Sequence, residues 1–264
     1  MVPEMKAPRA PAWIGIGAQR SGTTWFTHLL LRHPAVCLAS GKGTFIQRKE
    51  LHFFDRVLHS GLDANFVEAY HENFAVVEAS HPGEFTPSYL RCTWTAGLVR
   101  QAITPETIIV CLLRDPVERF YSAIRRSQQE SKRANKLEQL TKRRGELSRL
   151  IGGDALWGGM YASQLRAWRA VFAVQPFIVL QYEAVLKDPA TAVERVWSAM
   201  ELAPVDIGPA QPLSESSSAH KPWTHDLRQM PDLRMLLQTI YHPEVLELTR
   251  DWGIESELWT SAWL

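Results

Sequence analysis

Residues 14–25 read Ile14-Gly-Ile-Gly-Ala-Gln-Arg-Ser-Gly-Thr-Thr-Trp25, an apolar segment that runs directly into a glycine-containing turn. We predict a strand over Trp13–Gly17 and a helix over Thr23–Arg32. The turn then presents backbone N–H groups at a helix N-terminus, where free donors and the positive end of the helix dipole both favour an anion. The stretch therefore predicts a phosphate-binding loop at the end of a buried strand.

The side chains of this loop also suit a phosphate. Gly22 lets the backbone approach an anion closely, and Arg20 contributes a charge that persists at every physiological pH. Three hydroxyl groups add hydrogen-bond donors. We expect a nucleotide to be held here by Gln19, Arg20, Ser21, Gly22, Thr23 and Thr24. The alternative is a turn that opens a helix without binding any ligand.

The position of the positive charge distinguishes this loop from that of nucleotide-hydrolysing enzymes. Their pattern, G-x-x-x-x-G-K-[ST], has lysine directly after the second glycine. Here Gly17 and Gly22 have that spacing, but Thr23 stands in place of the lysine and the cation lies at Arg20. The form G-x-Q-[KR]-[ST]-G-T-T resembles the 5′-phosphosulfate loop of sulfotransferases that use 3′-phosphoadenosine 5′-phosphosulfate (PAPS) and release the bisphosphate PAP.

A second motif follows the apolar run Thr107–Leu113, which has the composition of a strand buried on both faces. It reads Arg114-Asp-Pro-Val-Glu-Arg-Phe-Tyr-Ser122, and Pro116 suits the first turn of a helix. Arg114 then lies at the carboxyl end of a central strand, where open α/β sheets bind ligands, with Ser122 about two turns into the helix. R-D-P-x-x-R-x-x-S resembles the 3′-phosphate-binding motif of the same family. The alternative for Arg114 is an ordinary salt bridge.

Three further segments resemble one branch of this family. Residues 48–55 resemble the K/N-E-x-H-F-F-D segment of heparan sulfate O-sulfotransferases and their N-sulfotransferase relatives, and residues 84–89 resemble their E-K-T-P-x-Y stretch. Residues 181–189 resemble the Y-E-x-L-x-x-D-P element found widely across sulfotransferases. The resemblance implies a bacterial, PAPS-dependent sulfotransferase of α/β fold, with a P-loop-like central parallel β-sheet flanked by helices.

The resemblance also implies the catalytic residues. Glu50 is the expected base for the acceptor, and such a base contributes about 10²–10⁴-fold. His52 is expected to orient Glu50, to bind the sulfate or to serve as the base itself. Arg20 is expected to bridge the 5′-phosphate and the transferring sulfuryl group. We expect no metal, because side chains supply the cations. The alternative for Glu50 is a surface ion pair with Lys49 or Arg48.

Two departures from the family pattern bear on the acceptor. Phe85 stands where the family has lysine, so we expect a missing cation and an apolar cleft wall. His220 and Lys221 stand near a family loop that closes over PAPS, and we expect them to replace part of it. Both changes favour a small or apolar alcohol or phenol, such as a free or carrier-bound secondary metabolite, over a heparan-type polyanion. A hydroxyl acceptor is preferred to an amine.

Composition sets the remaining limits. The chain has 264 residues and a net charge of +1, which gives no overall attraction to nucleic acid or membranes. No apolar run of about eighteen residues is present, and three cysteines fit a reducing compartment. We therefore expect a cytoplasmic protein with one sulfotransferase domain over residues 1–264, of which 1–12 form a flexible N-terminus.

The remaining pattern alternates short apolar runs with amphipathic segments, which predicts a parallel sheet covered on both faces. Further strands are expected at Val36–Leu38, Phe74–Glu78, Thr107–Leu113 and Phe177–Gln181. Further helices are expected at Asn65–Tyr70, Thr93–Ala102, Val117–Gln129, Gly159–Phe172, Thr191–Leu202 and Leu233–Ile240. Residues 125–149 are strongly basic and form either a solvated helical face or a lip for an acidic acceptor.

Two other functions remain open from the sequence. A P-loop nucleotide kinase would use Thr24 and Asp115 to hold Mg²⁺, although the missing loop lysine weighs against it. A non-catalytic nucleotide-binding protein would keep the fold alone, although the presence of both Glu50 and Arg20 favours an enzyme.

Overall fold

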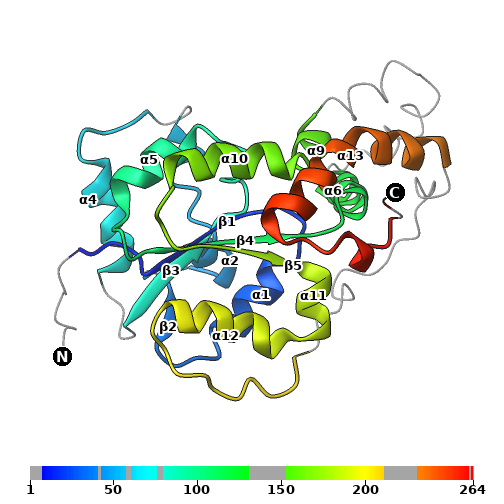
Figure 1. The fold of residues 1–264 in the computed structure, drawn as a ribbon. Coiled ribbons are helices and arrows are strands. Elements are labelled where there is room, and N and C mark those ends of the chain that lie inside the picture. Colours follow the sequence, from blue (N-terminus) through cyan, green and yellow to red (C-terminus); the bar gives the residue numbers. More distant parts are fainter. Residues whose placement is uncertain are drawn as a thin grey trace.

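The computed structural model describes residues 8–40, 43–57, 61–75, 80–130, 153–210, 231–261 and 263. Its centre is a five-stranded parallel sheet in the order β2-β3-β1-β4-β5 (Figure 1). The strands are β1 (Trp13–Gly17), β2 (Val36–Leu38), β3 (His81–Phe85), β4 (Ile108–Leu113) and β5 (Phe177–Gln181). Because all the strands are parallel, their carboxyl ends meet at one edge of the sheet. The predicted fold class is confirmed.

Helices cover both faces of this sheet. One face carries α1 (Thr23–Leu30), α11 (Tyr182–Lys187) and α12 (Pro189–Ala199). The opposite face carries α4 (Phe66–His71), α5 (Thr95–Ala102), α6 (Pro116–Glu130), α10 (Tyr161–Val171) and α13 (Pro231–Trp252) (Figure 1). The described helices and strands therefore form three layers, with the sheet in the middle.

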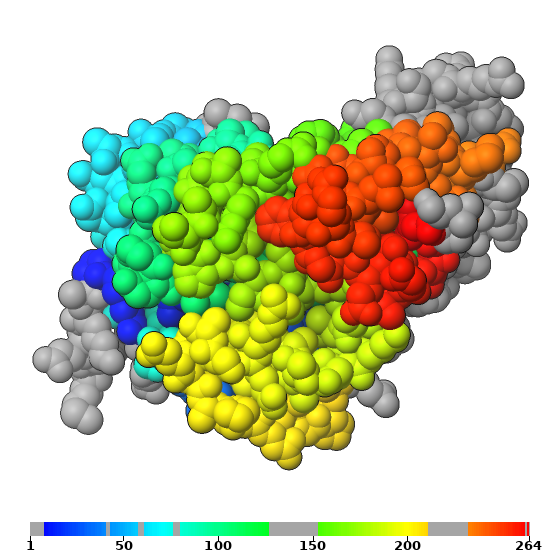
Figure 2. Space-filling model, viewed as in Figure 1, coloured from blue at the N-terminus to red at the C-terminus, as the bar shows by residue number. Residues whose placement is uncertain are grey.

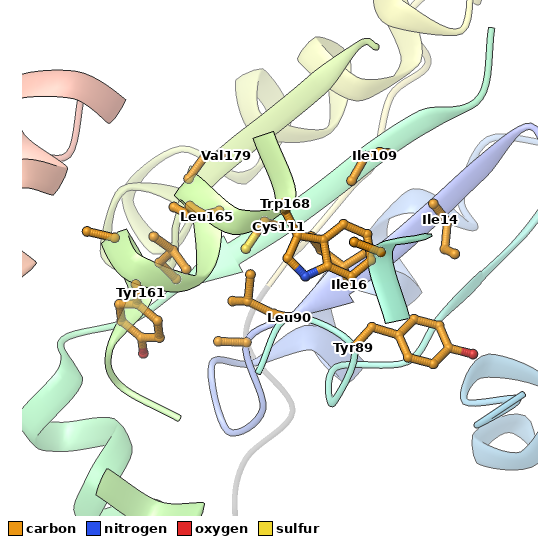
Figure 3. Packing of buried hydrophobic residues seen from close by; sticks show 14 of the residues in the cluster. Ile14, Ile16, Tyr89, Leu90, Ile109, Cys111, Tyr161, Leu165, Trp168 and Val179 are labelled. Carbon is orange, nitrogen blue, oxygen red and sulfur yellow. The ribbon is translucent and has the colours of Figure 1, made fainter. Parts of the chain in front are cut away.

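The strand β4 shows how two hydrophobic cores arise from one sheet. Successive side chains of a strand point to opposite faces. Ile109, Cys111 and Leu113 accordingly join the core beneath α5, α10 and α13, whereas the alternate residues Ile108, Val110 and Leu112 join the core beneath α1 and α12. Figure 3 shows the first of these cores, in which the indole of Trp168 from α10 lies beside Cys111 and Ile16. Both faces are buried, so the strand sequence is continuously apolar.

The prediction of a strand at Phe74–Glu78 is wrong for the residues of this range that the structure describes, 74 and 75. Phe74 ends a short 3-10 helix, η1 (Glu72–Phe74), and residues 76–79 lie outside the described part of the chain. The strand lies instead at β3, whose residues Pro82 and Gly83 are poor strand formers. A Cβ on Gly83 would lie 2.3 Å from the carbonyl oxygen of Trp13, so glycine is required for β1 and β3 to pack together.

The predicted helices up to residue 202 are confirmed to within three residues at either end.

The last predicted helix is longer than expected, because α13 runs from Pro231 to Trp252 and passes through Pro243. Its contacts with α10 explain this continuation: Ser163 donates a backbone hydrogen bond to Glu244 at 2.9 Å, and Arg166 pairs with Glu247. Figure 2 shows α13 lying beside α10 on this face. Five short helices of the described chain were not predicted: α2 (Phe45–Lys49), α9 (Asp154–Trp157), α11, η1 and η4 (Ser256–Leu258).

None of the helices in the described ranges has the length and apolar character needed to cross a bilayer. Of the basic segment 125–149, residues 131–149 lie outside the described part of the chain, as do residues 1–7 of the predicted N-terminal segment.

Candidate nucleotide-binding and transfer site

The predicted phosphate loop lies between β1 and α1, at the carboxyl edge of the sheet (Figure 1). Gly22 is the N-cap of α1 and has a φ of 83°, and no side chain caps the helix. Gly22 therefore offers no side-chain acceptor to the first N–H groups of α1, and the helix dipole favours an anion there. A Cβ on Gly22 would lie 2.4 Å from the ring of Tyr182, so the loop needs glycine at this position.

Arg20 connects this loop to the second motif. Its backbone has a positive φ of 73°, and its Nε donates a hydrogen bond of 3.1 Å to Oγ of Ser122 on α6. Ser21 and Thr23, on either side of Gly22, are buried. The structure thus brings together the two motifs that the sequence assigned to opposite ends of one nucleotide.

Arg114 follows β4 directly, as predicted, and its guanidinium lies over the ring of Tyr182 with 5.4 Å between Cζ and the ring centroid. Tyr182 follows β5 and also packs edge-on against Trp25 of α1. Tyr182 therefore contacts both the phosphate loop and Arg114. The sequence analysis missed this residue, although its position directly after a buried parallel strand was a usable signal.

Asp115 does not have the free carboxylate that the kinase interpretation requires. It is fully buried, and its Oδ1 accepts a hydrogen bond of 3.0 Å from the backbone N–H of Val117. Its Oδ2 accepts hydrogen bonds from Ser261 N at 2.8 Å and from Thr260 Oγ1 at 3.2 Å. Asp115 therefore caps α6 and anchors the C-terminal segment. Within the described ranges, no three His, Cys, Asp or Glu side chains are grouped to hold a metal ion.

Two of the three predicted catalytic residues, Glu50 and His52, form an array of ion pairs directly after α2, whereas Arg20 lies in the loop before α1. Glu50 is the C-cap of α2, and its Oε1 lies 2.7 Å from Nζ of Lys49. Its Oε2 lies 3.5 Å from Nε2 of His52, whose Nδ1 lies 2.9 Å from Oδ2 of Asp55. Ser88 also donates a hydrogen bond to Asp55. The structure therefore brings Glu50 and His52 together and adds Asp55 behind them.

The electrostatics of the array separate the roles of Glu50 and His52. Hydrogen bonds to Asp55 and Glu50 raise the pKa of His52 to about 9. Burial alone would raise the pKa of Glu50, but the hydrogen bond with His52 and the charge of Lys49 outweigh burial and lower it. Near neutral pH, His52 is therefore a cation and Glu50 a carboxylate. Of the two, Glu50 is the group able to accept a proton.

The buried carboxyl of Glu84 holds the backbone on which this array lies. It is fully buried at the end of β3, and burial raises its pKa to about 7. The backbone N–H of Leu51 donates a hydrogen bond of 3.2 Å to the Glu84 carboxylate. The hydroxyl of Thr86 also donates to this carboxylate, and it accepts a hydrogen bond of 3.2 Å from the backbone N–H of His52. The remaining donors to Glu84 are the hydroxyls of Tyr70 at 2.9 Å and Tyr89 at 3.0 Å. These contacts fix residues 51–53 beside the sheet.

Phe85 corrects one expectation. It does not form an apolar cleft wall, because its side chain is fully buried and fills the space over Gly15. The ammonium of Lys49 lies above its ring, 5.3 Å from the centroid. A cation therefore lies beside the position where the sequence analysis expected none. From the sequence, Lys49 was part of the segment that resembles K/N-E-x-H-F-F-D and a possible surface partner of Glu50, with no role of its own. His220 and Lys221 lie outside the described residues.

Comparisons with known proteins identify the family of the chain. Residues 11–220 match the Sulfotransferase domain family, and the chain belongs to that family. It is 28% identical over 192 residues to mouse heparan sulfate glucosamine 3-O-sulfotransferase 3A1, covering 70% of this chain and 44% of that protein. It is 28% identical over 194 residues to human heparan sulfate glucosamine 3-O-sulfotransferase 6, covering 71% of this chain and 51% of that protein. The chain thus spans about half the length of these relatives.

Solved structures support the fold. The crystal structure of a sulfotransferase from Alicyclobacillus acidocaldarius matches with a TM-score of 0.66 and 22% identity, covering 95% of this chain and 99% of that one. A sulfotransferase from Mycobacterium avium matches with a TM-score of 0.51 and 16% identity, covering 76% of this chain and 66% of that one.

Proposed function

We propose that this chain transfers a sulfuryl group from PAPS to a hydroxyl of a small-molecule, carrier-bound or glycan acceptor. One observation carries the proposal. The ammonium of Lys49 lies 2.7 Å from the carboxylate of Glu50 and 3.3 Å from Oγ1 of Thr23, the first residue of α1. A carboxylate able to accept a proton therefore lies one side chain away from the anion-binding loop.

The residues of the loop and of the second motif fit PAPS. The uncapped start of α1 suits the 5′-phosphosulfate, with hydroxyls from Ser21, Thr23 and Thr24 and a charge from Arg20. Arg114 and Ser122 suit the 3′-phosphate, because a guanidinium fork matches the oxygens of a phosphate monoester. PAPS supplies a sulfuryl group bound to a phosphate leaving group, and its transfer depends mainly on positioning and charge stabilisation.

Within this site, each catalytic residue has a distinct role. Glu50 accepts the proton of the acceptor hydroxyl as its oxygen attacks, a contribution of about 10²–10⁴-fold. His52, held as a cation by Asp55, orients Glu50 through its Nε2. Arg20 stabilises the negative charge that develops on the leaving phosphate. It does not donate a proton, because a guanidinium stays ionised.

The acceptor is proposed to approach beside Ser88 and Trp157. Ser88 contacts Asp55, and the short segment 88–91 connects it to Arg91. At its end, the indole of Trp157 donates to Arg91 O at 3.1 Å and is 45% exposed. An exposed aromatic face suits the ring of a phenol, an apolar alcohol or a sugar.

A donor assay with radiolabelled PAPS tests the function. The intact chain is incubated with PAPS and a panel of alcohols, phenols, amines and oligosaccharides, while calorimetry measures the binding of PAP. We expect PAP binding and label transfer to at least one hydroxyl compound, with full activity in a metal chelator and no phosphate transfer from ATP. Absence of PAP binding, or phosphate transfer from ATP, would contradict the proposal.

A further inference from the structure

Lys49 is a fully buried lysine, and the groups around its ammonium account for this burial. It is the last residue of α2, and its side chain has no exposed surface. Lysine is almost never fully buried unless its charge is paired. Its Nζ donates to Glu50 Oε1 at 2.7 Å and to Thr23 Oγ1 at 3.3 Å, and it lies over the ring of Phe85. Each of these groups belongs to a different part of the site.

The backbone around Glu50 makes this arrangement possible. Adjacent residues on a helix do not face each other. The helix ends at Lys49, and Glu50 has a φ of −112° and a ψ of 86°, which lie outside the helical region. This change of direction turns the carboxylate back toward the ammonium, and the segment after it is fixed by the hydrogen bond from Leu51 N to Glu84. The backbone conformation therefore holds the ion pair between Lys49 and Glu50 in place, unlike an ion pair between two adjacent side chains in solvent.

The aromatic ring of Phe85 packs beneath the ammonium of Lys49. The face of an aromatic ring attracts a cation. Phe85 fills the space over Gly15 and offers its ring to Lys49. Phe85 and Lys49 therefore suit each other in this chain.

From these contacts we propose that Lys49 is a positioning residue that joins the phosphate loop to the base and holds the carboxylate of Glu50 beside the start of α1. The inference rests on the proposed function of Glu50. The titratable groups that face this pair are His52, on the other oxygen of Glu50, Glu84, whose charge acts on Lys49, and His28 of α1, whose pKa is lowered by burial and by the charge of Lys49. The charge of Lys49 also adds to the attraction of the loop for the anionic nucleotide.

Two readouts that need no acceptor test this role. The pKa of Glu50 is followed by carbon NMR of glutamate-labelled protein, with the signal assigned through Glu50→Gln, and PAP affinity is measured by calorimetry. In Lys49→Met we expect a higher pKa for Glu50, because a favourable charge is lost, and PAP binding weaker by about tenfold. Lys49→Arg should restore both values toward those of the wild type. Lys187→Met, at an exposed lysine that ends α11, should change neither.

The outcomes separate this inference from the proposed function. If wild-type protein binds PAP but Lys49→Met leaves either readout unchanged, the role of Lys49 is wrong and the proposed function stands. If wild-type protein fails to bind PAP, the proposed function itself is wrong. Thermal unfolding checks that the methionine variant is folded. Should it not fold, Lys49→Gln, which keeps a hydrogen-bond donor without the charge, is measured for the same two changes.

Discussion

The guanidinium of Arg20 donates a hydrogen bond of 3.1 Å to the hydroxyl of Ser122, a residue 102 positions further along the chain. Arg20 lies in the turn after β1, and Ser122 lies on α6, which follows β4. Since β1 and β4 are neighbours in the sheet, their following segments meet at the same edge. The contact fixes a flexible side chain in advance of ligand binding, which lowers the entropy cost of binding an anion there.

Replacement of Arg20 by alanine should reduce the rate of sulfuryl transfer by about 10²–10³-fold, because one preorganised charge near the leaving phosphate is lost. Ser122→Ala should weaken PAP binding by no more than about tenfold. The two changes should not be additive, since each removes the same hydrogen bond. Steady-state kinetics and calorimetry on both single variants and the double variant provide the measurement. Strict additivity would show that the two side chains act independently.

Arg114→Ala should weaken the binding of PAP far more than that of adenosine 5′-monophosphate, which lacks the 3′-phosphate. The reason is that the guanidinium at the end of β4 is proposed to hold that phosphate group. Arg114→Lys should recover part of the difference, because it keeps the charge but loses the bidentate geometry. Calorimetric titration with both nucleotides gives the ratio of affinities. A ratio equal to that of the wild type would remove Arg114 from the 3′-phosphate site.

Glu50→Gln should leave PAP affinity nearly unchanged and lower turnover by at least about tenfold, since glutamine keeps the shape but cannot accept the proton. Single-turnover transfer from PAPS measures the chemical step, and calorimetry with PAP controls for the binding site. Equal turnover in the variant and the wild type would show that Glu50 is not the base.

The stability of the protein should depend on pH through His52. Its pKa is raised to about 9 by Asp55 and Glu50, above the value of about 6.5 in an unfolded chain. Its ion pairs therefore stabilise the fold fully below pH 6.5, and this contribution is lost as pH rises through about 9. The difference in unfolding temperature between wild type and His52→Gln should shrink over that range. A difference that stays constant from pH 6 to pH 10 would contradict the assignment.

Much of the site was predictable because its motifs are local. A buried strand, a turn and a helix follow one another in sequence at Gly22 and again at Arg114, so apolar runs followed by Gly22 and by Pro116 predict both strand–turn–helix units, while the roles proposed for Glu50 and His52 came from the resemblance to sulfotransferases. Lys49 differs, since its burial depends on Phe85 and Thr23, which are distant in sequence. Likewise β3 forms because Gly83 leaves room for Trp13, although its own residues disfavour a strand. Contacts between distant segments decide such cases, and a single sequence does not show them.

The geometry at Gly22 yields a prediction with a matched control. Gly22 and Gly208 both have positive φ values, 83° and 55°, so alanine is strained at either position. At Gly22 a new Cβ would also meet the ring of Tyr182 at 2.4 Å, whereas at Gly208 it would meet no atom within 4 Å. Gly22→Ala should therefore displace Tyr182 or the loop and reduce PAP affinity by at least about tenfold, while Gly208→Ala leaves it unchanged. Calorimetry on both variants makes the comparison. Equal losses would mean that the effect of Gly22→Ala on PAP affinity follows from backbone strain in general and does not depend on the contact between Gly22 and Tyr182.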